Sequence, residues 1–256
     1  MEFLTEEGLE KLVEEEAMKA KQIGVQYIKN PLGFRGHLRG VGNTAYKVAK
    51  KVLENNSSIN ESLVNPEICK VAGYMHDFEK ISYGDIWHDA IGAYMILTKG
   101  EERGLVSGES EQEKKEARIR IARCISSDYA LSWELGDNFP TTALYPLSKG
   151  LEEQIKYLQR NLSFTSKDLS IGEMTFPTSI EQQIALYADM FDLGGKTISV
   201  EERLNEIIER YGELAQTAPA DEAHYLRTIV EITSDISFQE RIFNVCKNVR
   251  KLAGLE

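Results

Sequence analysis

Four side chains in this sequence could together bind a divalent metal ion: His37, His76, Asp77 and Asp189. His76 and Asp77 are adjacent, and neighbouring residues of a helix point about 100° apart, so both can reach one ion only near a helix end. Imidazole and carboxylate groups together suit divalent first-row metals. An ion with open coordination positions would bind water and substrate oxygens, so the pattern predicts metal-assisted hydrolysis.

Three further residues could take part in this chemistry. Lys80 could neutralise charge on a phosphoryl group during its transfer. The other interpretation is that Lys80 is an ordinary solvated lysine at a helix end. His88 could be a second-metal ligand, a phosphate donor or a general acid, and its alternative is a histidine packed beside Trp87. Asp128 could be a second-metal ligand or a solvent-facing carboxylate. Asp77 could also orient or deprotonate the attacking water.

The elements that must position these residues are predicted to be helices. Apolar residues repeat with a helical period nearly everywhere, which indicates an all-α fold. His37 lies four residues before Val41 and extends the inward-facing stripe of its helix. His76 shares a face with Ile68 and Ala72, so it also points inward. Buried acids beside these histidines would need a cation to offset their desolvation.

Capping signals give the expected helix boundaries. The first helix is predicted to run from Thr5 to about Asn30, with Ile23 among its apolar residues. Asp85 is expected to open the helix of His88. A capping box from Thr178 to Glu181 is expected to open the helix that carries Asp189. The charged, glycine-containing connection 99–108 is predicted to be a flexible loop.

Composition excludes several classes of partner. The 256 residues carry a net charge of -11, with a pI near 5.1, which disfavours nucleic acid or an anionic membrane as the main partner. No apolar run approaches the roughly 20 residues that span a bilayer. The acidic N-terminus lacks the order of a signal peptide. Cys69, Cys124 and Cys246 are isolated and read as reduced thiols, so we expect a cytoplasmic protein.

With these residues placed on separate helices, the chain resembles the HD-domain superfamily of metal-dependent phosphohydrolases over roughly residues 34–211. The motifs that carry the resemblance are Gly36-His37-Leu38-Arg39-Gly40-Val41, Met75-His76-Asp77-Phe78-Glu79-Lys80, His88-Asp89-Ala90-Ile91-Gly92-Ala93 and Tyr187-Ala188-Asp189-Met190. The resemblance implies an HD-domain-like helical bundle. We expect a single helical domain over 1–256, with additional helices at 1–30 and 219–252.

The resemblance also implies a function. It predicts a phosphohydrolase that cleaves a phosphate ester or anhydride of a small molecule, with a nucleotide as the preferred candidate. The metal would be Mn, Fe, Co, Ni, Mg or Zn, held by His37, His76, Asp77 and Asp189. Members with several metals carry another histidine near the position of Asp128, which this chain lacks. That departure favours a single metal.

Several features stay open at this level. The missing histidine also fits an alternative function, a non-catalytic ligand-sensing or scaffold module on the same fold. Substrate selection, including monoester against diester, would come from the connections 99–108 and 133–177. Arg35 and Arg39 flank His37 and could bind phosphates, although surface arginines are the ordinary alternative. The apolar stripes of the terminal helices could close the domain, which we prefer, or form a homodimer surface.

Overall fold

The computed structural model describes residues 1–25, 28, 30–85, 88–108, 110–126, 179–193 and 196–255. In that part of the chain the predicted all-α fold is confirmed. The helices are α1 (Glu6–Gln22), α2 (Pro31–Asn55), α3 (Pro66–Met75), α4 (Lys80–Tyr83), α5 (His88–Lys99), α6 (Glu111–Ser126), α9 (Ile180–Met190), α10 (Val200–Thr217), α11 (Ala220–Ser234) and α12 (Ile236–Leu252). The described strands are two-residue pairs: β1 (Glu2–Phe3) with β2 (Val106–Ser107), and β3 (Asp192–Leu193) with β4 (Lys196–Thr197).

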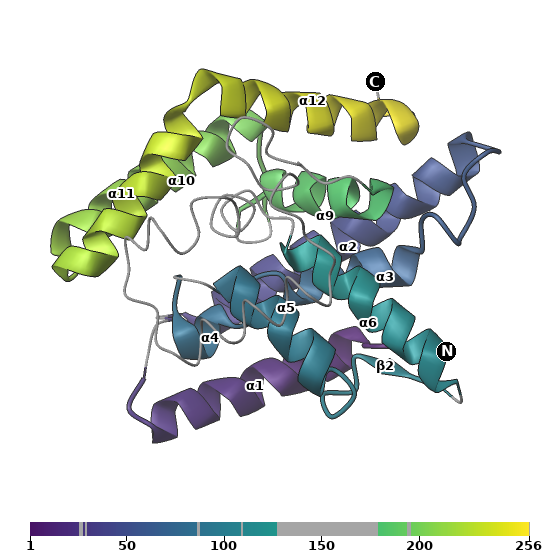
Figure 1. Cartoon of the computed structure of the whole chain (residues 1–256), viewed down its shortest axis with the longest axis horizontal. Coiled ribbons are helices and arrows are strands. Elements are labelled where there is room, and N and C mark those ends of the chain that lie inside the picture. The colour runs from purple at the N-terminus through teal and green to yellow at the C-terminus, as the bar shows by residue number, and fades with distance from the viewer. Residues whose placement is uncertain are drawn as a thin grey trace.

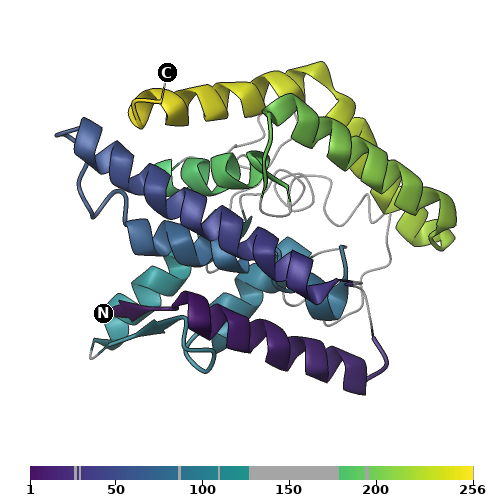
Figure 2. The same cartoon turned by 180° about the vertical axis from the view of Figure 1, so that it is seen from behind.

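Helices α2, α3 and α9 form the middle of the molecule, and His37, His76, Asp77 and Asp189 each lie on or next to one of them. Helices α1, α4, α5 and α6 lie on one side of this central group, and α10, α11 and α12 lie on the other (Figures 1 and 2). Each side has its own apolar core. Leu9, Tyr74, Phe78 and Ile121 belong to the first, and Val41, Ile184, Leu204 and Ile242 belong to the second. The central helices contribute to both cores.

Helices α2 and α3 cross with their backbones in contact because glycines stand at the crossing point. A Cβ atom added to Gly73 would lie 2.7 Å from the Cα of Gly42, and one added to Gly42 would lie 2.8 Å from the carbonyl oxygen of Lys70. No side chain larger than hydrogen fits there. The close crossing brings His37, at the start of α2, against His76, which is the C-cap of α3.

The terminal helices pack on the two cores, as the apolar stripes predicted. Leu9, Val13 and Ala20 of α1 are buried, and so are Phe238, Ile242, Cys246 and Val249 of α12. The side-chain amide of Asn55, at the end of α2, also donates to the carbonyl oxygen of Ala253, 2.9 Å away. All three cysteines are buried free thiols. Within the described chain, no helix has both the length and the apolar character needed to cross a bilayer.

Several predicted boundaries are wrong. Helix α1 ends at Gln22 rather than near Asn30, because Gly24 follows with a positive φ of 79° and turns the chain. Ile23, predicted to face the core, is therefore 72% exposed. Asn30 and Pro31 instead begin α2, where Asn30 accepts a hydrogen bond from the backbone N–H of Gly33.

The two other helices that carry site residues compare differently with the prediction. Helix α5 is described from His88 onward, and the carboxylate of Asp85, the residue predicted to open it, forms ion pairs with Lys80 and Arg210. The capping box of α9 is Ser179 with Gln182, one residue later than predicted. The connection 99–108, predicted to be a flexible loop, contains β2, and its buried Leu105 accepts a backbone hydrogen bond from Leu4 at 3.1 Å.

The crossing of α2 and α3 generates the first prediction. Gly73→Ala should lower the free energy of unfolding by about 1–3 kcal/mol, because the added methyl group meets backbone atoms that cannot move without separating the helices. It should also weaken metal binding, because His37 and His76 move apart. Urea denaturation and metal titration measure the two effects.

Gly36→Ala is the matched control, since a Cβ atom there meets nothing within 4 Å and the residue lies in the same helix α2. It should leave the free energy of unfolding unchanged or raise it by up to about 1 kcal/mol. Equal losses of stability and metal affinity in both variants would contradict the role assigned to the crossing.

Candidate metal centre

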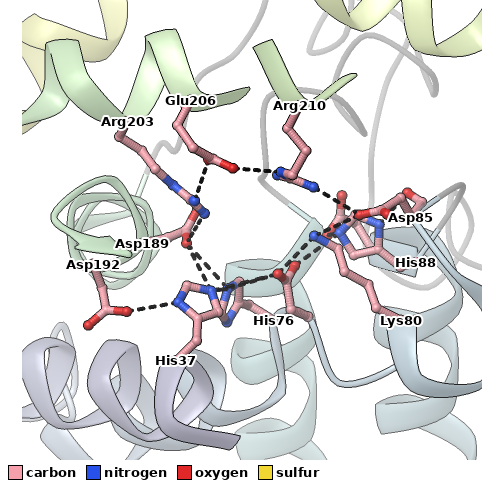
Figure 3. Close-up of polar contacts among 12 residues, drawn as sticks. His37, His76, Lys80, Asp85, His88, Asp189, Asp192, Arg203, Glu206 and Arg210 are labelled. Atoms are coloured by element: carbon pink, nitrogen blue, oxygen red, sulfur yellow. Dashed lines mark hydrogen bonds and ion pairs between the residues drawn. The ribbon is translucent and has the colours of Figure 1, made fainter. Parts of the chain in front are cut away.

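The structure brings the four predicted ligands together from separate helices. His37 comes from the first turns of α2, His76 and Asp77 follow the last turn of α3, and Asp189 lies at the end of α9 (Figure 3). The position of His76 as the C-cap explains how two adjacent residues can face one point, because the chain leaves the helix there. His37 and Asp77 are buried, and the side chains of His76 and Asp189 are only 12% and 13% exposed.

The donor atoms have the spacing of ligands around one ion. His37 Nε2 lies 3.2 Å from His76 Nε2, 3.5 Å from Asp189 Oδ1 and 3.7 Å from Asp77 Oδ2. His76 Nε2 lies 3.4 Å from Asp189 Oδ1 and 3.6 Å from Asp77 Oδ2. Four ligands placed about 2.1 Å from a common centre would be separated by about 3.4 Å in a tetrahedral arrangement. The donor atoms of His37, His76 and Asp77 all lie within 4.8 Å of one another, so these three residues fit a metal ion, and Asp189 Oδ1 lies against both histidines.

The hydrogen bonds of the two histidines leave both Nε2 atoms available to a metal. His37 Nδ1 donates to Asp192 Oδ1 at 2.8 Å, and His76 Nδ1 donates to the carbonyl oxygen of Gly73 at 2.9 Å. Because both acceptors require the proton on Nδ1, each neutral ring presents a lone pair at Nε2. Two lone pairs that face each other at 3.2 Å need a proton or a cation between them.

In the absence of a metal, His37 carries the extra proton at neutral pH. Burial alone would lower its pKa, but the hydrogen bond with Asp192 and the nearby Asp77 and Asp189 carboxylates outweigh burial and raise the pKa to about 9. A metal that binds here must displace this proton. Proton and metal thus compete for the same lone pair.

Both ligand carboxylates are held ionised. Burial would raise the pKa of Asp77, but Lys80 and the surrounding histidines hold it well below its usual range. For Asp189, the Arg203 guanidinium opposes the effect of burial and also holds the pKa well below the usual range. Lys80 Nζ lies 2.8 Å from Asp77 Oδ2, and Arg203 Nη2 lies 2.9 Å from Asp189 Oδ1.

Asp77 joins this centre to a second group of potential ligands. Its Oδ1 atom lies 3.1 Å from His88 Nε2, which is also 2.9 Å from Asp89 Oδ1. His88 Nδ1 donates to the carbonyl oxygen of Asp85 at 2.7 Å, so Nε2 needs a second proton to donate to these carboxylates. Although burial opposes the charge, Asp89 and Asp77 raise the pKa of His88 well above its usual value. His88, Asp77 and Asp89 could instead hold a second cation.

The remaining predicted site residues have different outcomes. Lys80 is buried between Asp77 and Asp85, so the solvated-lysine alternative is wrong. Asp128, the possible second-metal ligand, lies outside the described residues, and so does the connection 133–177. Arg39 is exposed, and Arg35 is the surface arginine of the ordinary alternative, 3.7 Å from Glu10 and 3.8 Å from Glu14.

A group of charged residues that the sequence pattern did not predict supports the four side chains. Asp192 orients His37, and Arg203, Glu206 and Arg210 project from one face of α10 toward the centre (Figure 3). Arg203 was detectable, because it falls among Val200, Leu204 and Ile207 on the apolar stripe of its helix. A charged residue on such a stripe indicates a buried partner.

A small cavity borders the centre between the central helices and α6. It has a volume of about 20 Å³ and is lined by Gly73, His76, Cys124, Ile125, Ala185, Leu186 and Asp189. This space can hold one water molecule but not a phosphate ester.

Comparison with known proteins identifies no relative. No protein-family model matches the chain, and no curated protein or solved structure matches it. The function must therefore be argued from the arrangement of the residues themselves.

The role of Asp192 generates the second prediction. Asp192→Ala removes the acceptor that orients the His37 ring, so the dissociation constant for the metal should rise about 10–100-fold. Asp192→Asn keeps an oxygen acceptor and should lose less affinity. Competition with a chromophoric chelator measures both constants, and an Asp192→Ala variant with the affinity of the original protein would contradict the orienting role.

The competition between proton and metal generates the third prediction. His37 is protonated below its pKa of about 9, so metal affinity should increase from pH 6.5 to pH 9 and then level off. Calorimetric titration at pH 7 in buffers of different ionisation enthalpy should detect release of about one proton for each ion bound. Affinity that is independent of pH over this range would show that no histidine proton is displaced.

Proposed function

We propose that this protein is a metal-dependent phosphohydrolase that cleaves a phosphate ester or anhydride of a small molecule, with a nucleotide as the preferred substrate. The observation that carries the proposal is the convergence of His37, His76 and Asp77 at the spacing of metal ligands, with Asp189 Oδ1 against both histidines. Among the described residues, no cysteine belongs to this group of potential ligands. The donor set therefore differs from that of common structural zinc sites, which use thiolates.

A bound divalent ion would polarise a phosphoryl oxygen and lower the pKa of a water ligand that attacks phosphorus. Four protein ligands would close a tetrahedral zinc site, whereas an ion that accepts five or six ligands keeps positions for water and substrate. The residues thus favour Mn, Fe, Co, Ni or Mg over four-coordinate Zn in a catalytic centre.

The residues around the ligands have roles in this reaction. Lys80 is a permanent cation beside Asp77 and can balance negative charge on the phosphoryl group as it is transferred. His88 is held as an imidazolium by Asp77 and Asp89 and can donate its Nε2 proton to a leaving oxygen. Asp77 can orient the attacking water, because its two oxygens face the metal ligands and His88 separately.

One observation favours the alternative, a non-catalytic ligand-sensing or scaffold module. Lys80 and Arg203 already neutralise Asp77 and Asp189, so the cluster is ion-paired without a metal. Such a cluster could be a buried polar core with no reaction to perform. A group of histidine and carboxylate donors at the spacing of metal ligands is more than this role requires, and we therefore prefer the enzyme.

The fourth prediction tests the proposal. The protein should retain about one equivalent of metal and hydrolyse 4-nitrophenyl phosphate in the presence of manganese, cobalt, nickel or magnesium. Asp77→Asn should abolish both metal retention and turnover, because it removes a charged ligand. Lys80→Met should keep the metal but lower kcat about 100-fold or more, because charge on the transferred group is no longer balanced. Plasma mass spectrometry and absorbance assays measure the two quantities.

Lys114→Met is the matched control for Lys80. Lys114 has the same exposed fraction as Lys80, 7% each, and is also ion-paired, but its partners are the exposed carboxylates of Glu101 and Glu111. It should leave kcat unchanged. If metal-loaded protein shows no turnover with any phosphate monoester, diester or nucleotide, the enzyme proposal is wrong and the sensing module takes its place.

A further inference from the structure

The two ligand carboxylates are joined by a chain of alternating charges. From Asp77 the contacts pass through Lys80, Asp85, Arg210, Glu206 and Arg203 to Asp189 (Figure 3). Helix α10 supplies Arg203, Glu206 and Arg210, which are spaced by three and four residues and so lie on one face. A single rigid helix therefore places two guanidinium groups beside the metal centre.

The two arginines are not equivalent. The side chain of Arg203 is 7% exposed, and its Nη atoms are bound to Asp189 and Glu206. It holds a metal ligand in place and has no access to a substrate. The side chain of Arg210 is 32% exposed, with Nε 2.8 Å from Glu206 Oε1 and Nη1 3.2 Å from Asp85 Oδ1. Its third nitrogen, Nη2, has no protein partner among the described residues.

Arg210 is therefore a guanidinium that is fixed in orientation and still has donor capacity. Arg210 forms ion pairs with Glu206 and Asp85, and its Cζ atom lies over the Tyr211 ring, 4.5 Å from the ring centroid. A side chain held in this way loses little conformational freedom when it binds an anion. Guanidinium is the group best suited to phosphate oxygens, because its N–H donors match their geometry.

The contacts of Asp85 place Arg210 on the same side of the centre as Lys80. One Asp85 oxygen, Oδ1, lies 3.5 Å from Lys80 Nζ and 3.2 Å from Arg210 Nη1, and Lys80 in turn lies 2.8 Å from Asp77. Of the two cations that share Asp85, Arg210 is the more exposed, with 32% of its side chain accessible against 9% for Lys80. No other described arginine combines contact with this network and exposure to solvent.

We propose, on the basis of the function proposed above, that Arg210 is a substrate-binding residue that donates from Nη2 to a non-bridging oxygen of the substrate phosphate. Helix α10 then supplies the anion-binding edge of the site, and Asp85 and Glu206 orient its donor. Arg35 and Arg39, which the sequence offered only as possible phosphate ligands, lie elsewhere: Arg35 pairs with Glu10 and Glu14, and Arg39 is exposed.

The fifth prediction measures binding of inorganic phosphate to the metal-loaded protein. Arg210→Met should weaken phosphate binding, and its competitive inhibition of 4-nitrophenyl phosphate hydrolysis, about tenfold or more, because a charge-assisted hydrogen bond is lost. KM should rise more than kcat falls. Metal content should be unchanged, because Arg210 contacts no metal ligand in the structure. Calorimetry and inhibition kinetics give the affinities.

Two further variants make the test decisive. Arg227→Met on α11 removes an exposed arginine outside the network and should bind phosphate as the original protein does. Arg210→Lys keeps the positive charge, so it tests the same position if the Met variant fails to fold. It should still bind phosphate several-fold more weakly than the original protein, because the guanidinium geometry is gone. If Lys fully restores phosphate affinity, or if Arg210→Met matches Arg227→Met, Arg210 only balances charge and the inference is overturned.

The same experiment separates this inference from the function on which it rests. Metal-loaded original protein that neither hydrolyses 4-nitrophenyl phosphate nor binds phosphate would overturn both. Turnover that is intact in the original protein and unaffected in Arg210→Met would overturn the role of Arg210 alone.

Discussion

Two imidazole lone pairs that face each other across 3.2 Å are the constraint on which the centre depends. Asp192 and the Gly73 carbonyl fix the Nδ1 protons, so neither ring can turn its own proton into the gap. Only an added proton or a metal ion between the two nitrogens can relieve the repulsion of their lone pairs. Because the Asp77 and Asp189 carboxylates also lie near the two Nε2 atoms, a divalent ion would balance more of the local negative charge than a single proton does.

The rest of the network follows from the cost of burying these carboxylates. Asp77, Asp85, Asp189 and Glu206 are each matched to Lys80, Arg203 or Arg210, so that no ionised group is left without a partner of opposite charge. Helix α10 therefore has two functions in this protein. Its apolar stripe packs on α9 and α11, and its charged face completes the electrostatic balance of a site built by other helices.

The sequence was sufficient to predict the all-α fold and the buried cluster of His37, His76 and Asp77, but not the supporting residues. His37, His76 and Asp189 extend apolar helical stripes, so local periodicity already turns them inward. Arg210 and Asp192 carry no such signal, because a charged residue outside an apolar stripe is ordinarily solvated, and their partners Asp85 and His37 are 125 and 155 residues away along the chain. The misplaced end of α1 has a local cause, since the apolar Ile23 fits the helical pattern and only Gly24 stops the helix.

The long separation between partners also bears on how the protein folds. Helices α2 and α3 can meet early, because His37 and His76 are 39 residues apart, but the contact between His37 and Asp192 closes a loop of 155 residues. Such a contact forms late, after much of the chain is ordered. A metal ion would then find its full set of ligands only in the nearly native protein. Metal binding would then lower the unfolding rate and leave the folding rate nearly unchanged.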